Sequence, residues 1–254
     1  MIPVCIFCGG SGTRLREMTD FLPKPMIPIG PYPIVTHIIK HYQHYGYTDF
    51  ILMLGFKQEK FKEYFAHYDI INNDITVDIG RGVNRHGYSD RGLRITLCDT
   101  GVETLKGERL RRVEKYVHGD TFLLTYGDAV SDINLWELVE FHQAHGKIGT
   151  VTGVRRPPRF GELVRYGSQV TLFSEKAVET DCLINGGYFV FDRRIFDYLE
   201  EGGDFEIGAL ERLAIDGELM VYEHNGYWKC CDMLKDLNDL QKAWESGAPE
   251  WKVW

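Results

Sequence analysis

No hydrophobic run in this 254-residue chain approaches the roughly 20 residues that a membrane-spanning helix needs. The N-terminal segment Met1–Cys8 has neither a basic region nor a small-residue cleavage site, so we expect no signal peptide. Cysteine is also scarce, because six residues are too few for a disulfide scaffold in a chain of this length. We therefore expect reduced thiols and a cytoplasmic protein.

Positive charge is the next shortage. The chain has 29 Lys and Arg residues against 37 Asp and Glu residues, a net charge of -8, which disfavours a nucleic-acid polymer as the main partner. A small anionic ligand is still compatible with this charge if basic residues gather in one cleft. Hydrophobic residues at 44% and charged residues at 26% are ordinary globular usage, which excludes collagen, coiled coil and disorder.

Short runs rich in Val, Ile and Phe alternate with amphipathic segments of helical length. This alternation predicts a mostly parallel sheet that is covered on both faces, within a single domain spanning residues 1–254. The predicted strands are Val4–Phe7, Phe50–Leu54, Ile95–Cys98, Phe122–Thr125, Thr150–Val154, Tyr188–Phe191 and Leu219–Tyr222. The predicted helices are Ile34–Tyr45, Glu59–Tyr68, Leu110–Val117, Leu135–His145, Ile207–Ile215 and Leu234–Glu245.

One segment does not follow this alternation. Residues Gly80–Gly92 contain several basic side chains and four glycines, and we expect a long loop there. Loops of this length are either functional or simply solvated. A mobile lid and an ordinary surface loop are both consistent with the pattern.

Two patterns with metal-binding residue types are interpreted as structural. Cys5 and Cys8 have the spacing of a redox or zinc half-motif, but they lie in a predicted strand, where positions three apart point to opposite faces. His142 and His145 lie three apart on a predicted helix, and we expect them on its surface.

A glycine-rich turn follows the first predicted strand. Gly9, Gly10 and Gly12 allow a ligand to approach the backbone closely, and successive N–H groups in such a turn bind anions. Thr13 adds a hydroxyl donor, and Arg14 adds a cation that can bind two phosphate oxygens. The turn is not a Walker loop, because no Gly-Lys-Ser or Gly-Lys-Thr follows the glycines. It also fails the dinucleotide fingerprint, which needs a small residue at its last position, where this chain has Leu15.

A second basic element follows within the next dozen residues. Pro23 and Pro25 restrict the backbone around Lys24, which can hold its ammonium group toward a phosphate. Taken alone, Lys24 would be an ordinary exposed lysine in a turn. Its pairing with the glycine-rich turn instead favours a nucleotidyltransferase loop.

These two elements resemble the signature of the sugar-1-phosphate nucleotidyltransferases, and the resemblance covers nearly the whole chain. It implies a Rossmann-like three-layer nucleotidyltransferase fold of the α/β class, with a mixed, mostly parallel central sheet. Within that superfamily the chain is similar to the glucose-1-phosphate cytidylyltransferases. The supporting segments are Pro33-Ile34, Glu63-Tyr64-Phe65, Asp99-Thr100-Gly101, Arg109–Val113, Thr125–Asp128, Phe141–Lys147, Arg159-Phe160-Gly161, Asn185-Gly186-Gly187 and Trp244-Glu245.

The resemblance implies a set of nucleotide-binding residues: Phe7, Cys8, Gly9, Gly10, Ser11, Gly12, Thr13, Arg14, Lys24, Thr104, Arg109 and Gly127. Of these, Arg14 and Lys24 are expected to be catalytic together with Asp128, because charge on the triphosphate must be offset. Arg109 begins a predicted helix, from which it can reach an anion or a base edge. The adjacent Arg111 and Arg112 cannot face the same way on a helix, so we expect one of them to be solvated.

Two aspartates are expected to hold Mg²⁺. Nucleotidyl transfer concentrates negative charge on the phosphates, and Mg²⁺ binds one or two carboxylates together with phosphates and water. The resemblance implies that Asp128 and Asp232, which each follow a strand, are these ligands. The alternative for Asp128 is a helix cap, because Ser131 and Asp132 lie near the start of a helix.

The resemblance places the sugar phosphate at Gly161, Glu175, Lys176 and Asn185. Lys176 would hold the phosphate, and Glu175 and Asn185 the sugar hydroxyls. The chain departs from the family pattern on this side, with Ala177 in place of proline and with Glu162–Arg165 in place of an Ala-Leu-Asp run. It also has Gly107-Glu108 where the family commonly has two glycines.

The function expected from the resemblance is transfer of a cytidylyl group from CTP to α-D-glucose 1-phosphate, giving CDP-glucose and pyrophosphate, for polysaccharide biosynthesis. No enzymic nucleophile is needed, because the sugar phosphate supplies an ionised oxygen and the enzyme aligns it. The expected partners are CTP and a sugar 1-phosphate in a homo-oligomer, with no nucleic acid and no membrane. One alternative is transfer of a cytidylyl or another nucleotidyl group to a different phosphorylated acceptor, and another is a non-catalytic nucleotide-binding regulator.

Overall fold

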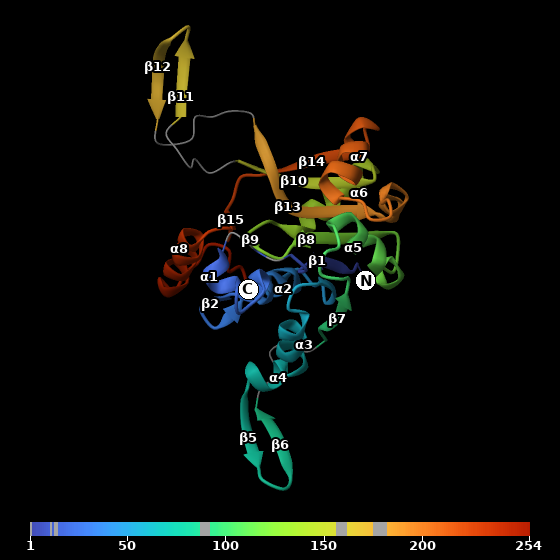
Figure 1. Cartoon of the computed structure of the whole chain (residues 1–254), viewed down its shortest axis with the longest axis vertical. Coiled ribbons are helices and arrows are strands. Elements are labelled where there is room, and N and C mark those ends of the chain that lie inside the picture. Colours follow the sequence, from blue (N-terminus) through green and yellow to red (C-terminus); the bar gives the residue numbers. More distant parts are fainter. Residues whose placement is uncertain (1, 11, 13–14, 87–91, 156–161, 175–181) are drawn as a thin grey trace.

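A seven-stranded sheet forms the centre of the molecule (Figure 1). The computed structural model describes residues 2–10, 12, 15–86, 92–155, 162–174 and 182–254. The sheet order is β14-β10-β13-β8-β1-β4-β7, and β13 is antiparallel to both of its neighbours whereas the other adjacent pairs are parallel. Its strands are β1 (Val4–Phe7), β4 (Asp49–Leu54), β7 (Arg94–Asp99), β8 (Thr121–Tyr126), β10 (Gly149–Arg155), β13 (Leu183–Asp192) and β14 (Leu219–His224).

The seven predicted strands are the seven strands of this sheet, so the mixed, mostly parallel α/β architecture is confirmed. Every residue of β1 and β4 is buried, as expected for strands covered on both faces. Along β1, Val4 and Ile6 join one hydrophobic cluster, and Cys5 and Phe7 join the other. Alternation along a strand therefore supplies both cores of the three-layer fold.

The helices cover the two faces of the sheet. The first cluster is completed by α2, α3, α6 and α8, and the second by α5, η4, η5 and α7. The bounds are α1 (Arg16–Thr19), η2 (Lys24–Met26), α2 (Ile34–His44), α3 (Gln58–Ala66), α4 (Tyr68–Ile71), α5 (Lys106–Val113), η3 (Glu114–Tyr116), α6 (Leu135–His145), η4 (Arg193–Tyr198), η5 (Phe205–Leu210, a π-helix), α7 (Glu211–Ile215) and α8 (Leu234–Glu245).

Four of the predicted helices agree with α2, α3, α6 and α8 to within two residues at each end. The other two begin earlier than predicted and are divided, into α5 with η3 and into η5 with α7. The first turn of α5 packs closely against the segment around Gly203, because a Cβ on Gly107 would come within 2.7 Å of the Gly203 carbonyl oxygen. Among the described residues, no helix is long and apolar enough to span a membrane.

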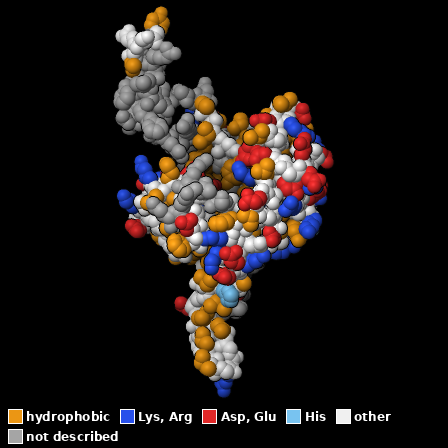
Figure 2. Space-filling view, viewed as in Figure 1, with side chains coloured by type: hydrophobic (Ala, Val, Ile, Leu, Met, Phe, Trp, Pro, Cys, Tyr) orange, Lys and Arg blue, Asp and Glu red, His pale blue; other side chains and the backbone are white. Residues whose placement is uncertain are grey.

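Four two-stranded ribbons surround the central sheet. They are β2 (Pro28–Ile29) with β3 (Tyr32–Pro33), β5 (Asp74–Asp78) with β6 (Gly82–His86), β9 (Ala129–Ser131) with β15 (Trp228–Cys230), and β11 (Glu162–Tyr166) with β12 (Gln169–Ser174). The β5–β6 hairpin projects from the body (Figure 1) and carries a strip of hydrophobic side chains (Figure 2). Its exposed members are Ile75, Val77, Ile79 and Val83.

The prediction of one long loop over Gly80–Gly92 is wrong for its first part. Gly82–His86 is strand β6, which pairs with β5 and places Val83 opposite Val77. Gly80 and Gly82 have φ angles of +102° and +117°, so these glycines form the tight turn and not a long loop. Residues 87–91 lie outside the described residues.

Cys5 and Cys8 lie on opposite faces as predicted, whereas the histidine prediction is wrong. Cys5 and Cys8 are buried in different clusters, and all six cysteines are free. His142, expected on a helix surface, is 4% exposed, and its Nδ1 lies 2.9 Å from the Thr150 hydroxyl oxygen. Nε2 of His145 lies 2.7 Å from the same oxygen. Helix α6 packs the side that carries these histidines against β10. The periodicity of the helix sequence did not indicate this contact.

Burial lowers the pKa of three histidines, His37, His41 and His142, from 6.5 to about 4. Between these two pH values, the unfolded chain binds protons that the folded chain does not. The free energy of unfolding should therefore fall as pH drops from 6.5 to 4, by up to about 1.4 kcal/mol per pH unit for each histidine.

Urea unfolding at pH 7.5, 6.0 and 5.0 measures this slope. His142→Gln should flatten it by the equivalent of one proton. An unchanged slope in the His142→Gln variant would contradict the assignment.

Candidate active site

The glycine-rich turn leaves the sheet at the carboxyl end of β1, between β4 and β8. A Cβ on Gly9 would come within 2.2 Å of the Arg109 Nη1 atom, so only glycine fits there. Gly12 has a φ angle of +62°, in the left-handed region that favours glycine. The turn is thus shaped for close approach to the backbone. Three of its predicted ligand-binding residues lie outside the described residues: Ser11, Thr13 and Arg14.

The Arg109 side chain binds the backbone of this turn. Its side chain is almost fully buried, and burial lowers the pKa of its guanidinium group. The group donates hydrogen bonds of 2.6–3.2 Å to the Thr100 hydroxyl and to the backbone carbonyls of Gly9, Leu54, Gly101 and Val102. Arg109 therefore joins the loops that follow β1 and β7 to the last residue of β4. Its direct contact with an anion or a base stays a prediction.

Lys24 lies in η2 with its ammonium group between two carboxylates. Its Nζ atom is 2.5 Å from Asp128 Oδ2 and 2.6 Å from Asp232 Oδ1. Burial by itself would lower the pKa of Lys24, but the charges and hydrogen bonds of the two aspartates outweigh this effect and raise it. Lys24 therefore stays protonated, and it neutralises part of the charge of the pair.

A small ribbon brings the two aspartates together. Asp128 directly precedes β9 and Asp232 follows β15, and these strands pair with Cys230 opposite Ala129. The Cys231 N–H donates to the Asp128 carbonyl at 2.9 Å, which continues the ladder to the aspartates. The pairing, not proximity in the sequence, therefore creates the carboxylate pair.

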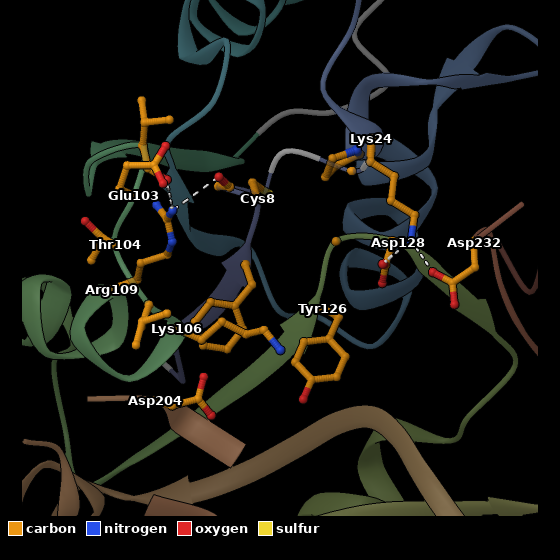
Figure 3. A pocket seen from close by; sticks show the side chains of 18 residues that line it. Cys8, Lys24, Glu103, Thr104, Lys106, Arg109, Tyr126, Asp128, Asp204 and Asp232 are labelled. Atoms are coloured by element: carbon orange, nitrogen blue, oxygen red, sulfur yellow. Dashed lines mark hydrogen bonds and ion pairs between the residues drawn. The ribbon is translucent and has the colours of Figure 1, made fainter. Parts of the chain in front are cut away.

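These groups line a cavity of about 570 Å³. Figure 3 shows Lys24 between Asp128 and Asp232 on one side of it, with Arg109 and Thr104 on the opposite side. The cavity brings together most of the residues predicted for the nucleotide and the metal, namely Phe7, Cys8, Gly9, Gly10, Gly12, Lys24, Thr104, Arg109, Gly127, Asp128 and Asp232.

The cavity also has lining residues that the sequence analysis did not predict. Tyr126 immediately precedes the quoted Gly127-Asp128 pair, so its position on a strand end was the available signal. Lys106 and Asp204 gave no such signal, because each is one charged residue in a polar stretch. The others are Pro25, Val102, Glu103 and Leu105.

The predicted sugar-phosphate residues are only partly located. Gly161, Glu175 and Lys176 lie outside the described residues. Asn185 does not line the cavity itself, but its Nδ2 atom donates to the hydroxyl oxygen of Tyr126, which does, at 3.1 Å. Binding of a sugar phosphate by Asn185 stays a prediction.

The departure at Glu108 has a structural role. Its carboxylate is buried and accepts hydrogen bonds from Arg111 Nε at 2.6 Å and from Arg112 Nε at 2.8 Å. It also accepts one from the Gly202 N–H, and the pKa of Glu108 is lowered to about 2, chiefly by Arg111. Both arginines pair with Glu108 on the same helix, and Arg112 is exposed to solvent, as expected for one of the two.

The donor set of the site fits a divalent cation that is shared with a phosphate ligand. Among the described residues, no group of three or more His, Cys, Asp or Glu side chains gathers to hold a metal. Asp128 and Asp232 instead offer two carboxylates that already converge on one cation, the Lys24 ammonium group. Two carboxylates, completed by phosphate oxygens and water, are what Mg²⁺ prefers. Asn134, and not Asp128, caps α6.

The comparison with known proteins agrees with this geometry. Residues 4–246 match the family model described as nucleotidyl transferase. The chain is 44% identical over 98% of both chains to a probable glucose-1-phosphate cytidylyltransferase of Bacillus subtilis (strain 168). It is 41% identical, again over 98% of both, to the glucose-1-phosphate cytidylyltransferase of Salmonella typhi.

A solved structure shares the fold at low identity. It is a putative glucose-1-phosphate thymidylyltransferase from Bacillus anthracis, with a TM-score of 0.68, 18% identity, and coverage of 95% of this chain and 94% of that one. The family match over almost the whole chain and the identity to its two relatives lead to one conclusion: this protein belongs to the nucleotidyl transferase family.

Proposed function

We propose that this protein transfers the cytidylyl group of CTP to α-D-glucose 1-phosphate, giving CDP-glucose and pyrophosphate in a Mg²⁺-dependent reaction. The observation that carries the proposal is the ion-pair cluster of Lys24, Asp128 and Asp232 in a cavity that opens at the glycine-rich turn. The choice of CTP and glucose 1-phosphate is supported by the two relatives that match over 98% of the chain.

In this proposal, Lys24 exchanges partners when the nucleotide binds. Its ammonium group sits between the two carboxylates, and a triphosphate in the cavity offers oxygens that compete for it. Lys24 then donates to the triphosphate and offsets negative charge that builds up as the pyrophosphate departs. The prolines on both sides of Lys24 limit how far its backbone moves during this exchange.

Asp128 and Asp232 would hold Mg²⁺ after Lys24 leaves them. The cation would supply charge neutralisation at the phosphate oxygens. The protein needs no nucleophile of its own, because an oxygen of the sugar phosphate forms the new bond to the α-phosphorus. The bond from that phosphorus to the pyrophosphate oxygen breaks, and the bonding electron pair leaves with pyrophosphate. The cavity walls contribute by aligning the two substrates.

The homo-oligomer expected from the sequence also belongs to this proposal. The exposed hydrophobic strip of the β5–β6 hairpin supports it, because a projecting apolar strip is typical of a surface that contacts another chain.

Pyrophosphate release in the presence of MgCl₂ tests the reaction. We expect release only when CTP and glucose 1-phosphate are both present, among the four ribonucleoside triphosphates and a panel of sugar phosphates. Release with CTP and another acceptor would keep nucleotidyl transfer and reject glucose. No release from a folded protein that still binds CTP would favour the regulator and overturn the proposal.

Lys24→Ala should lower kcat/KM for CTP by at least about 100-fold, because charge stabilisation at the phosphates is lost. Lys229→Ala is a matched control, since Lys229 also forms a 2.6 Å ion pair, with Asp239, but does not line the cavity. A folded Lys24→Ala enzyme with near-normal kcat/KM would rule out the proposed role of Lys24.

The metal assignment can be tested without turnover. In Lys24→Ala the two aspartates lose the cation between them, so their repulsion lowers the melting temperature and Mg²⁺ should restore it. Millimolar MgCl₂ should therefore raise the melting temperature of Lys24→Ala more than that of the wild-type protein, and Asp128→Asn in addition should abolish the difference. An equal response in all three proteins would contradict a carboxylate metal site.

A further inference from the structure

A second hydrogen-bonded cluster lies at the part of the cavity wall formed by Lys106 and Tyr126. Its members are Lys106, Glu206, Tyr126 and Asn185, which come from α5, η5, β8 and β13. Lys106 forms an ion pair with Glu206, and its Nζ atom lies 4.8 Å from the centre of the Tyr126 ring. Figure 3 shows Lys106 and Tyr126 at the same part of the cavity wall.

The direction of each hydrogen bond in this cluster is determined by its neighbours. The Tyr126 hydroxyl donates its only hydrogen to Glu206 Oε1 at 2.6 Å. Its oxygen can therefore only accept from Asn185, whose Nδ2 atom lies 3.1 Å away. Burial, followed by the charge of Glu206, raises the pKa of Tyr126, so the hydroxyl keeps its hydrogen at neutral pH.

The Asn185 amide is held at both ends. Its Oδ1 atom accepts the Gly187 N–H at 2.8 Å, so its nitrogen must face Tyr126. Gly187 in turn lies against the Tyr126 ring, where a Cβ would come within 2.5 Å of Cδ2. The ring and the hydroxyl of Tyr126 thus determine together where the Asn185 amide lies. An amide nitrogen carries two hydrogens, and the one not donated to Tyr126 can be donated to a ligand oxygen.

We propose that Tyr126 is a positioning residue for the acceptor: its hydroxyl, oriented by Glu206 and Lys106, holds Asn185 as a hydrogen-bond donor to a hydroxyl oxygen of the sugar phosphate. This inference rests on the proposed function and adds the residues that set its affinity for the acceptor. Since the Asn185 oxygen is used by Gly187, the site presents a donor here and selects an acceptor oxygen on the ligand.

The distinguishing variant is Tyr126→Phe, which removes only the hydroxyl and leaves the Lys106–Glu206 pair. We expect KM for glucose 1-phosphate to rise about 5- to 10-fold, as loss of one positioned hydrogen bond predicts, with kcat and KM for CTP changed less than about 2-fold. Tyr222→Phe is the matched control, because Tyr222 also donates to a glutamate, Glu137, at 3.1 Å, and is not in the cavity wall. It should change none of these constants.

A double-mutant cycle tests whether Tyr126 acts through Asn185. In an Asn185→Ala background, Tyr126→Phe should raise KM for glucose 1-phosphate by less than about 2-fold, since the group that it positions is gone. Glu206→Gln retains an acceptor for the hydroxyl and should stay near the wild-type KM, whereas Glu206→Ala should resemble Tyr126→Phe.

The outcomes separate this inference from the proposed function. A wild-type enzyme without CTP- and glucose 1-phosphate-dependent turnover would overturn the proposed function first. Three other outcomes would leave the function standing and overturn the positioning role of Tyr126. They are an unchanged KM for glucose 1-phosphate in Tyr126→Phe, equal rises in the KM values for both substrates, and additive effects in the double-mutant cycle.

Discussion

An ammonium group between two carboxylates is the interaction on which the site depends. Lys24 is 104 residues from Asp128 and 208 residues from Asp232, yet its Nζ atom contacts both. All three side chains are largely buried, so removal of any one leaves a charge without compensation in a poorly hydrated place. A phosphate ligand can enter only if it replaces these contacts with others of similar strength. The same cluster therefore joins segments that lie far apart in the sequence at one wall of the cavity.

The cavity walls depend on backbone carbonyls that two buried charged side chains organise. Arg109 binds carbonyls from two loops and from the end of β4 at once, and Glu108 ties the same helix to the segment around Gly202. A guanidinium group suits this task because it offers five donors in a fixed plane. The ribbon of β9 and β15 completes the frame by bringing Asp232 beside Asp128. These contacts tie the loops that line the cavity to the strands and helices around it.

Much of the fold could be predicted because its signals are local. A strand buried on both faces, such as β1 or β4, is a continuous hydrophobic run, and this run is a local signal. The ribbons were missed because strands of two to six residues with polar or exposed side chains, such as Asp74–Asp78, lack that run. The surface prediction for His142 is wrong for a related reason. Periodicity shows which side of a helix is apolar, but it does not show that the Thr150 hydroxyl on β10 lies within hydrogen-bond distance of His142.

The candidate site, like the fold, could be predicted only in part from the sequence. Phosphate and metal binding need particular residue types at strand ends. The linear order therefore predicts the glycines, Lys24 and the two aspartates as site residues. The sequence does not show that these residues lie together, that Arg109 binds backbone carbonyls, or that a cluster forms around Tyr126. These contacts depend on strand pairing and helix packing between segments that are distant in sequence. Local patterns report the burial and backbone needs of single elements, whereas pairwise contacts arise only when the sheet order places those elements side by side.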